Sequence, residues 1–150
     1  MVFIYSHTSQ PQKHVESLVT KVTELVSKLY SLPNKIEIQF ENMGPNVYGM
    51  TMLDPRFSSR IRLNQDLNYE ELIYPLTHEL LHLHQMHTCR LQSRSGGRIL
   101  WENQIYKVAT DKLSYREYLE LPWEKDVTEK QHKLLDFLQQ NAKKIKVKKP

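Results

Sequence analysis

The chain contains a single cysteine, Cys89, among its 150 residues, so no disulfide can form within it. A lack of disulfides is typical of proteins from a reducing compartment. No long apolar run occurs, and the N-terminal segment "MVFIYSHTSQPQ" turns polar too early to contain the core of a signal peptide. We therefore expect a cytoplasmic protein with no membrane-spanning segment.

The sequence also lacks internal repeats and low-complexity linkers, and its length fits one domain with its own core. Hydrophobic residues make up 39% and charged residues 25%, a balance typical of globular proteins. Much of the net charge of +4 lies in the final "AKKIKVKKP", where no aromatic residue alternates with the lysines. We interpret residues 1–141 as one domain and 142–150 as a solvated, frayed tail, and expect no specific nucleic-acid binding.

Hydrophobic periodicity predicts an α+β fold. A short β-prone run, "VFIY", precedes a helix expected over residues 12–30, whose apolar positions recur at spacings of three and four: Val15, Leu18, Val19, Val22, Leu25, Val26 and Leu29. The segments "KIEIQFE", "NVYGMTML" and "SRIRLN" follow as strand-like runs with turn residues between them. The simplest arrangement of these runs is a mostly antiparallel sheet of three to four strands.

A second helix is expected in "NQDLNYEELIYPLTHELLHLHQMH", and its start is ambiguous. Asn68 is suitable as an N-cap, but Pro75 also allows a later start with Tyr74 just outside the helix. Residues 88–98 are expected to form a loop, and "ILWENQIYKVA" is ambiguous between strand and helix. A last helix is expected beyond Pro122.

Four of the seven histidines lie within one stretch of ten residues, 78–87, in the second expected helix. His78 and His82 are four residues apart, so on a helix both imidazoles project from one face and can reach the same metal ion. Glu79 lies between them and points about 100° round the helix from His78. This is the H-E-x-x-H pattern, in which the two histidines bind Zn²⁺ and Glu79 acts as general base on a metal-activated water.

The other two histidines of this segment do not extend the pattern. His84 lies about 200° round the helix from His82. His87 is one residue out of register for H-E-x-x-H-x-x-G-x-x-H, and Gln85 stands where that motif requires glycine. A metzincin site is therefore excluded, and we expect His84 and His87 not to bind the metal. Gln85 lies on nearly the same face as His82 and is a candidate to support the site.

The third metal ligand has two candidates. A catalytic zinc site commonly has three protein ligands, and a His, His, Glu set requires a downstream carboxylate. Glu102, in "LWENQIY", follows His82 by twenty residues, whereas Glu124, in "LPWEKDV", is expected to open the last helix. Spacing alone leaves both open.

The combination of "HELLHLHQ", "WENQIY" and "YREYLELPWEKDV" resembles a group of small bacteriophage-encoded zinc metallopeptidases of gluzincin type. The resemblance covers roughly residues 60 to 130 and includes a PWE block that is quite specific. The chain departs from the group at Asn103, where glycine is usual, and at Val127, where alanine is usual. The resemblance favours Glu124, the glutamate of PWE, over Glu102 as the third ligand.

The resemblance implies a small zincin-like (minigluzincin) fold and a Zn²⁺-dependent peptidase that acts on a protein or peptide, in the host cytoplasm if phage-encoded. Tyr115 and Tyr118, just before the PWE block, are the candidates to stabilise the oxyanion, with Tyr106 behind them. A substrate peptide is expected to pair with an exposed strand, in "YGMTML" or "SRIRL". A non-catalytic zinc-containing interaction or regulatory module and a hydrolase of non-peptide amides are the alternatives.

Overall fold

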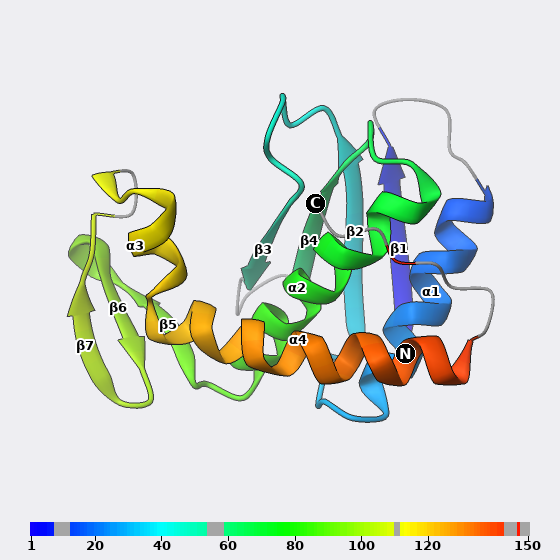
Figure 1. The fold of residues 1–150 in the computed structure, drawn as a ribbon. Helices are drawn as coiled ribbons and strands as arrows, with labels where there is room; N and C mark the ends of the chain where they lie inside the picture. The colour runs from blue at the N-terminus through cyan, green and yellow to red at the C-terminus, as the bar shows by residue number, and fades with distance from the viewer. Residues whose placement is uncertain (8–12, 54–58, 110–111, 143–146, 148–150) are drawn as a thin grey trace.

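The computed structural model describes residues 1–7, 13–53, 59–109, 112–142 and 147 (Figure 1). The α+β class is as expected, with helices packed beside a mixed sheet and a second, smaller sheet. The elements in chain order are β1 (Val2–His7), α1 (Lys13–Ser27), β2 (Lys35–Glu41), β3 (Gly49–Leu53), β4 (Ser59–Asn64), α2 (Tyr69–His87), β5 (Leu91–Arg94), β6 (Arg98–Trp101), β7 (Gln104–Lys107), α3 (Tyr115–Leu119) and α4 (Pro122–Asn141).

The first sheet is mostly parallel, so the predicted antiparallel arrangement is wrong. Its strand order is β1-β2-β4-β3, with β1 and β4 parallel to β2 and only β3 antiparallel, to β4. The helix α1 crosses over between β1 and β2, which makes those strands parallel. The chain then forms β3 at the edge of the sheet before it returns to β4 in the middle. The strands β2 and β3, which follow each other in sequence, are therefore not neighbours in the sheet.

The two faces of this sheet differ in character. Ile36, Ile38 and Ile61 point inward and are fully buried, in agreement with the alternation in the sequence. The opposite face carries cross-strand ion pairs, of which Arg60 and Glu37 form one at 3.3 Å. Only the apolar face can therefore receive the helices.

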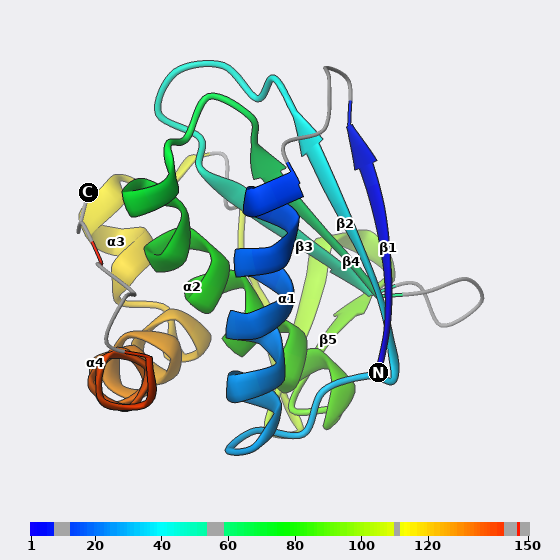
Figure 2. The same cartoon turned by 90° about the vertical axis from the view of Figure 1, so that its right-hand side faces the viewer.

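The helix α2 packs on that face with α1 and α4 on either side of it (Figure 2). It buries most of its residues, and its apolar side chains form one continuous core with those of the sheet and of both flanking helices. On α1 the predicted stripe is confirmed at Leu18, Val19, Val22 and Val26, which are buried. A helix covered on three sides can hold side chains away from water, which the chemistry of a metal site requires.

The helix α2 begins at the earlier of the two predicted positions. Asn68 is its N-cap, and its side chain accepts a hydrogen bond from the Glu71 amide at 2.9 Å, while the Glu71 side chain accepts one from the Asn68 amide in return. This capping box fixes the first turn. Pro75 is therefore inside the helix, where a proline removes one backbone hydrogen bond.

A buried amide joins α2 to α4 beside Pro75. The side chain of Gln131 is buried, and its amide donates to the Tyr74 carbonyl at 2.8 Å and to the Thr77 hydroxyl at 2.9 Å. The predicted start of α4 at Pro122 is confirmed. Leu134, Leu135 and Leu138 of α4 are buried against α2, as their spacing indicates.

The segment after α2 forms the second sheet, with strand order β5-β6-β7. The loop predicted for residues 88–98 is therefore wrong over β5, and the ambiguous segment after it is a β-hairpin. Glu102 and Asn103 form its two-residue turn with φ angles of 47° and 68°. Both central residues of such a turn require positive φ, which asparagine tolerates better than most residues. Asn103 can thus replace the glycine that the resembling sequences carry.

None of the described helices is both long enough and apolar enough to cross a membrane. Most of the predicted tail lies outside the described residues. Of residues 142–150 the structure describes Ala142 and Val147, and both contact the core.

Candidate metal centre

The helix α2 presents His78 and His82 on one face, one turn apart. Their Nε2 atoms are 3.2 Å from each other, and the ring centroids are 4.8 Å apart. His82 is almost fully buried, whereas His78 lies nearer the surface with 23% of its side chain exposed. The two imidazoles can therefore bind one metal ion together, His82 from the buried side and His78 from the side nearer the solvent.

The helix α4 brings the third donor from about forty residues away in the sequence. Pro122 occupies the start of the helix and Glu124 its first turn. Glu124 is only 2% exposed. Its carboxylate lies between the two imidazoles, with Oε1 3.0 Å from His82 Nε2 and Oε2 3.4 Å from His78 Nε2. His78, His82 and Glu124 thus lie together and could hold a metal ion.

The donor spacing and the buried carboxylate fit a metal ion. Ligand atoms about 2.0–2.1 Å from a tetrahedral ion lie about 3.3–3.4 Å from one another, close to the separations found here. Glu124 Oε2 is buried and forms no hydrogen bond with the described residues, although His78 Nε2 lies 3.4 Å from it. A buried carboxylate oxygen without a partner is costly unless a cation compensates it. Two imidazoles and one carboxylate are a donor set that suits zinc.

The charges of the cluster also favour a cation. Burial raises the pKa of Glu124, but its contacts with His78 and His82 lower that pKa by more, so the carboxyl is ionised. Burial lowers the pKa of His82, but Glu124, the charge of Glu79 and the hydrogen bond with Gln85 together raise it above its ordinary value. Attraction between the Glu124 carboxylate and a positive charge on the imidazole contributes to both shifts. A metal ion would supply that positive charge in place of the proton.

Glu79, the predicted base, lies beside the cluster and is held by the edge strand. The hydroxyl of Thr51 donates to Glu79 Oε2 and is 3.0 Å from the Glu79 carbonyl oxygen. At Gly49 the strand passes so close that an added Cβ would be 2.9 Å from Glu79 Cγ. Glu79 is 8% exposed, so its carboxylate is confined between α2 and β3. Neither Thr51 nor Gly49 is recognisable from sequence, because neither belongs to the motif.

Gln85 connects His82 to a polar network on α4. Its Oε1 is 2.9 Å from His82 Nδ1, and its amide nitrogen donates to the Trp123 carbonyl at 2.9 Å and to Asp126 Oδ2 at 2.8 Å. A proton on His82 Nδ1 leaves the lone pair of Nε2 free to bind a metal ion. Gln85 therefore supports the site as its position on the helix predicts.

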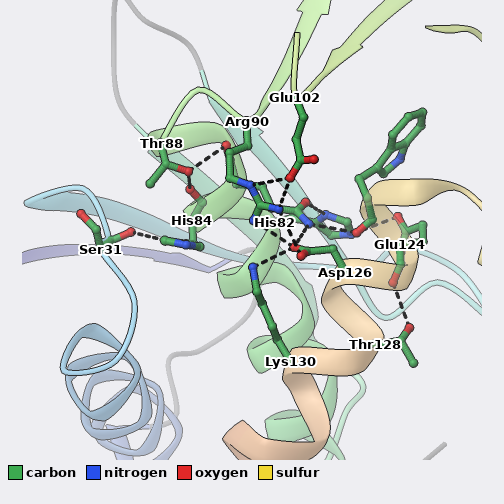
Figure 3. A network of polar contacts seen from close by, with 12 residues as sticks. Ser31, His82, His84, Thr88, Arg90, Glu102, Glu124, Asp126, Thr128 and Lys130 are labelled. Atoms are coloured by element: carbon green, nitrogen blue, oxygen red, sulfur yellow. Dashed lines mark hydrogen bonds and ion pairs between the residues drawn. The ribbon is translucent and has the colours of Figure 1, made fainter. Parts of the chain in front are cut away.

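The outer part of the network contains Glu102, the alternative third ligand. Arg90 binds Glu102 at 2.5 Å and Asp126 at 3.2 Å (Figure 3). Lys130 binds Asp126 at 3.0 Å. The side chain of Glu102 is 53% exposed in the β6–β7 turn. Glu102 thus pairs with an arginine, and Glu124 is the carboxylate next to the two histidines.

The candidate tyrosines occupy different positions. Tyr118, on α3, donates its hydroxyl to Glu124 Oε1 at 2.6 Å. Burial and the charge of Glu124 raise the pKa of Tyr118 well above its ordinary value, so the hydroxyl keeps its proton. Tyr115 is 78% exposed, and Tyr106 packs edge-on against Trp123 with ring centroids 5.6 Å apart. Tyr118 is thus the only one of the three with a contact to the metal cluster among the described residues.

His84 and His87 lie apart from the cluster, as predicted. His84 Nδ1 donates to the Ser31 carbonyl at 2.9 Å (Figure 3). The His84 ring packs against Tyr30. Burial lowers the pKa of His84 below its ordinary value. His87 is exposed at the last position of α2.

Two hollows meet at Glu79. The first, of about 770 Å³, lies between β3 and β5 and is called the β3–β5 groove; it is lined by residues that include Glu79, His82 and Glu124. The second, of about 590 Å³, is called the tyrosine pocket after Tyr48, Tyr74, Tyr115 and Tyr118, and His78 also lines it. Gly49, Glu79 and Tyr118 line both hollows. The group formed by His78, His82 and Glu124 is therefore accessible from both sides of Glu79.

Comparison of the chain with protein-family models, with curated proteins and with solved structures finds no match.

Proposed function

We propose that this chain is a zinc-dependent metallopeptidase that cleaves peptide bonds in a protein or peptide. One observation carries the proposal. The Glu79 carboxylate is not part of the His78, His82, Glu124 cluster but lies beside it, at the meeting point of two open hollows. A site that served only stability would need ligands alone, and usually a closed set of four. Here a base and space for a substrate accompany the ligands.

Each side chain has a definite task in this scheme. His78, His82 and Glu124 hold the metal, which when bound supplies Lewis-acid chemistry by lowering the pKa of water and polarising the scissile carbonyl. Thr51 holds Glu79 Oε2, so Glu79 Oε1 takes the proton from the attacking water and passes it to the leaving amine. Tyr118 keeps its proton, and its hydroxyl is directed at the cluster.

The sheet supplies a place for the peptide backbone. Of the two strands predicted for this role, β4 ("SRIRL") lies inside the sheet between β2 and β3 and is already paired on both sides. The strand β3 ("GMTML") pairs with β4 alone among the described strands, and its Thr51 and Gly49 border Glu79. A substrate that adds a strand to β3 therefore passes directly beside the base.

Substitution of the base tests the proposal. Purified zinc-loaded protein is expected to cleave casein, an unfolded protein substrate, and Glu79→Gln is expected to lower the rate by at least about a hundredfold because no carboxylate remains to accept the proton. Zinc content is expected to stay at the wild-type level, since Glu79 is not in the cluster.

Glu70→Gln provides the matched control, because Glu70 is an exposed glutamate in the first turn of the same helix. It is expected to cleave casein at the wild-type rate. Full activity in Glu79→Gln would refute the mechanism. A zinc-loaded wild-type protein that cleaves no protein or peptide would instead favour the non-catalytic zinc module.

A further inference from the structure

The second sheet forms one wall of the β3–β5 groove. All four residues of β5, Leu91 to Arg94, line this groove, as do Gly49, Met50 and Thr51 of β3. Successive side chains of a strand point to opposite faces of its sheet. A hollow that touches several consecutive residues of a strand therefore meets that strand at its edge. The groove thus lies between two strand edges, with Glu79, His82 and Glu124 among its lining residues.

Both strands end their sheets at the groove. The strand orders β1-β2-β4-β3 and β5-β6-β7 leave one side of β3 and one side of β5 without a partner strand in the described part of the chain. In an antiparallel ladder, residues alternate between those that bond to the partner strand and those whose backbone groups point the other way. The register therefore shows which backbone groups face the groove.

On β3 the outward residues are Gly49 and Thr51. Asn64 donates its amide to the Tyr48 carbonyl at 3.0 Å, which makes Tyr48 and Asn64 a hydrogen-bonded pair. In the β3–β4 register the next such pair is Met50 and Arg62. The backbone groups of Gly49 and Thr51 consequently point to the free edge.

On β5 the outward residues are Leu91 and Ser93. Glu102 donates its amide to the Arg90 carbonyl at 2.9 Å, so Arg90 and Glu102 are a hydrogen-bonded pair. The register then makes Gln92 and Arg94 the residues bonded to β6. Leu91 and Ser93 are left with amide and carbonyl groups directed to the groove.

The edge of β5 is held in a fixed relation to the metal cluster. Trp123 precedes Glu124 in α4, and it packs with the buried Leu91 and Trp101 of the second sheet. Its ring is 6.5 Å from that of Trp101. The guanidinium of Arg90 lies 4.7 Å over the Trp101 ring and also binds Asp126 of α4. The apolar cluster and the ion pair together fasten the second sheet to the same turn of helix that carries Glu124.

We propose that the β3–β5 groove binds one extended segment of polypeptide, whose main chain forms hydrogen bonds to the free edges of both β3 and β5. This inference rests on the proposed peptidase function and names its substrate class: an unfolded or locally extended polypeptide that spans several residues. A chain held on both edges lies across the cluster with its amides fixed on each side of the scissile bond. Short peptides and small amides reach only one edge and are poor substrates.

Amide hydrogen exchange tests the two-edge arrangement in the zinc-loaded Glu79→Gln protein, which retains the groove and does not turn over. The probe is a pool of twelve-residue casein peptides. We expect slowed exchange at the amides of Leu91 and Ser93 as well as those of Gly49 and Thr51. The same peptides cut to three residues are expected to leave the β5 amides unchanged.

A substitution at the edge gives the second measurement. Ser93→Pro removes only the outward amide, since proline is tolerated at an edge position that forms no ladder bond. It is expected to weaken binding of the twelve-residue peptides about three- to tenfold, the value of one hydrogen bond. Ser93→Ala removes the hydroxyl but keeps the amide, and it is expected to weaken binding less than Ser93→Pro does.

Two outcomes separate this inference from the function on which it rests. Protection of Gly49 and Thr51 without Leu91 and Ser93, in a protein whose wild type cleaves casein, would overturn the two-edge groove and leave the peptidase intact. A wild type that neither cleaves casein nor binds its peptides would overturn both.

Discussion

Gln85 Oε1 accepts a hydrogen bond from His82 Nδ1 at 2.9 Å, and the Gln85 amide donates to two acceptors on α4. One fully buried side chain thus fixes the ring of His82, a candidate metal ligand, and the start of the helix that contains Glu124. Such outer contacts set ligand orientation and typically change metal affinity by 10- to 100-fold.

Gln85→Met is therefore expected to raise the zinc dissociation constant about 10- to 100-fold, because methionine fills the space without holding His82. Competition with a chromogenic chelator measures the constant. Gln131→Met is the matched control, since Gln131 is also a buried amide between α2 and α4 but touches no member of the cluster. Equal loss of zinc affinity in both variants would show that Gln85 acts through stability alone.

Gly49→Ala is expected to lower the cleavage rate while zinc binding stays unchanged. The new Cβ would lie 2.9 Å from Glu79 Cγ, so the base must move from its place against Thr51. A displacement of about 1 Å at a reacting group costs roughly a hundredfold in rate. Steady-state cleavage of casein peptides measures the loss, and Ile105→Ala, at an exposed position of β7 outside both hollows, is the control. Wild-type turnover in Gly49→Ala would show that this close approach does not position Glu79.

Tyr118→Phe is expected to weaken zinc binding about tenfold, because the hydroxyl that donates to Glu124 Oε1 is lost. At saturating zinc, kcat is expected to fall further if the same hydroxyl stabilises the oxyanion. Tyr115→Phe removes an identical hydroxyl from a side chain that is 78% exposed and is expected to change neither quantity. Equal effects of the two substitutions would remove Tyr118 from the site.

Local patterns in the sequence predict several elements of the fold correctly. The helical stripe of α1 and the start of α4 at Pro122 each depend on residues close together in the chain. For α2 the same patterns leave two starts open, at Asn68 and at Pro75, of which the structure has the first. The order of the strands in the sheet does not follow from local patterns of this kind. The parallel pairing of β4 with β2 results from placing β3 at the edge, a long-range choice that no local pattern encodes.

The site divides in the same way. His78, Glu79 and His82 share one helical turn, so their spacing alone predicts their arrangement. Glu124 could be chosen over Glu102 only through resemblance, because its position depends on how α4 packs against α2. Thr51, Gly49 and the edge of β5 reach the site through tertiary packing and carry no sequence signal of their own.

The most direct test of the metal centre is the zinc content of purified, zinc-reconstituted protein, measured by inductively coupled plasma mass spectrometry. The wild type is expected to hold one zinc per chain, and Glu124→Ala to lose it, because Glu124 lies 3.0 and 3.4 Å from the two imidazoles. Glu102→Ala is expected to keep the zinc, since Glu102 pairs with Arg90. Full zinc in Glu124→Ala, or none in the wild type, would contradict the account.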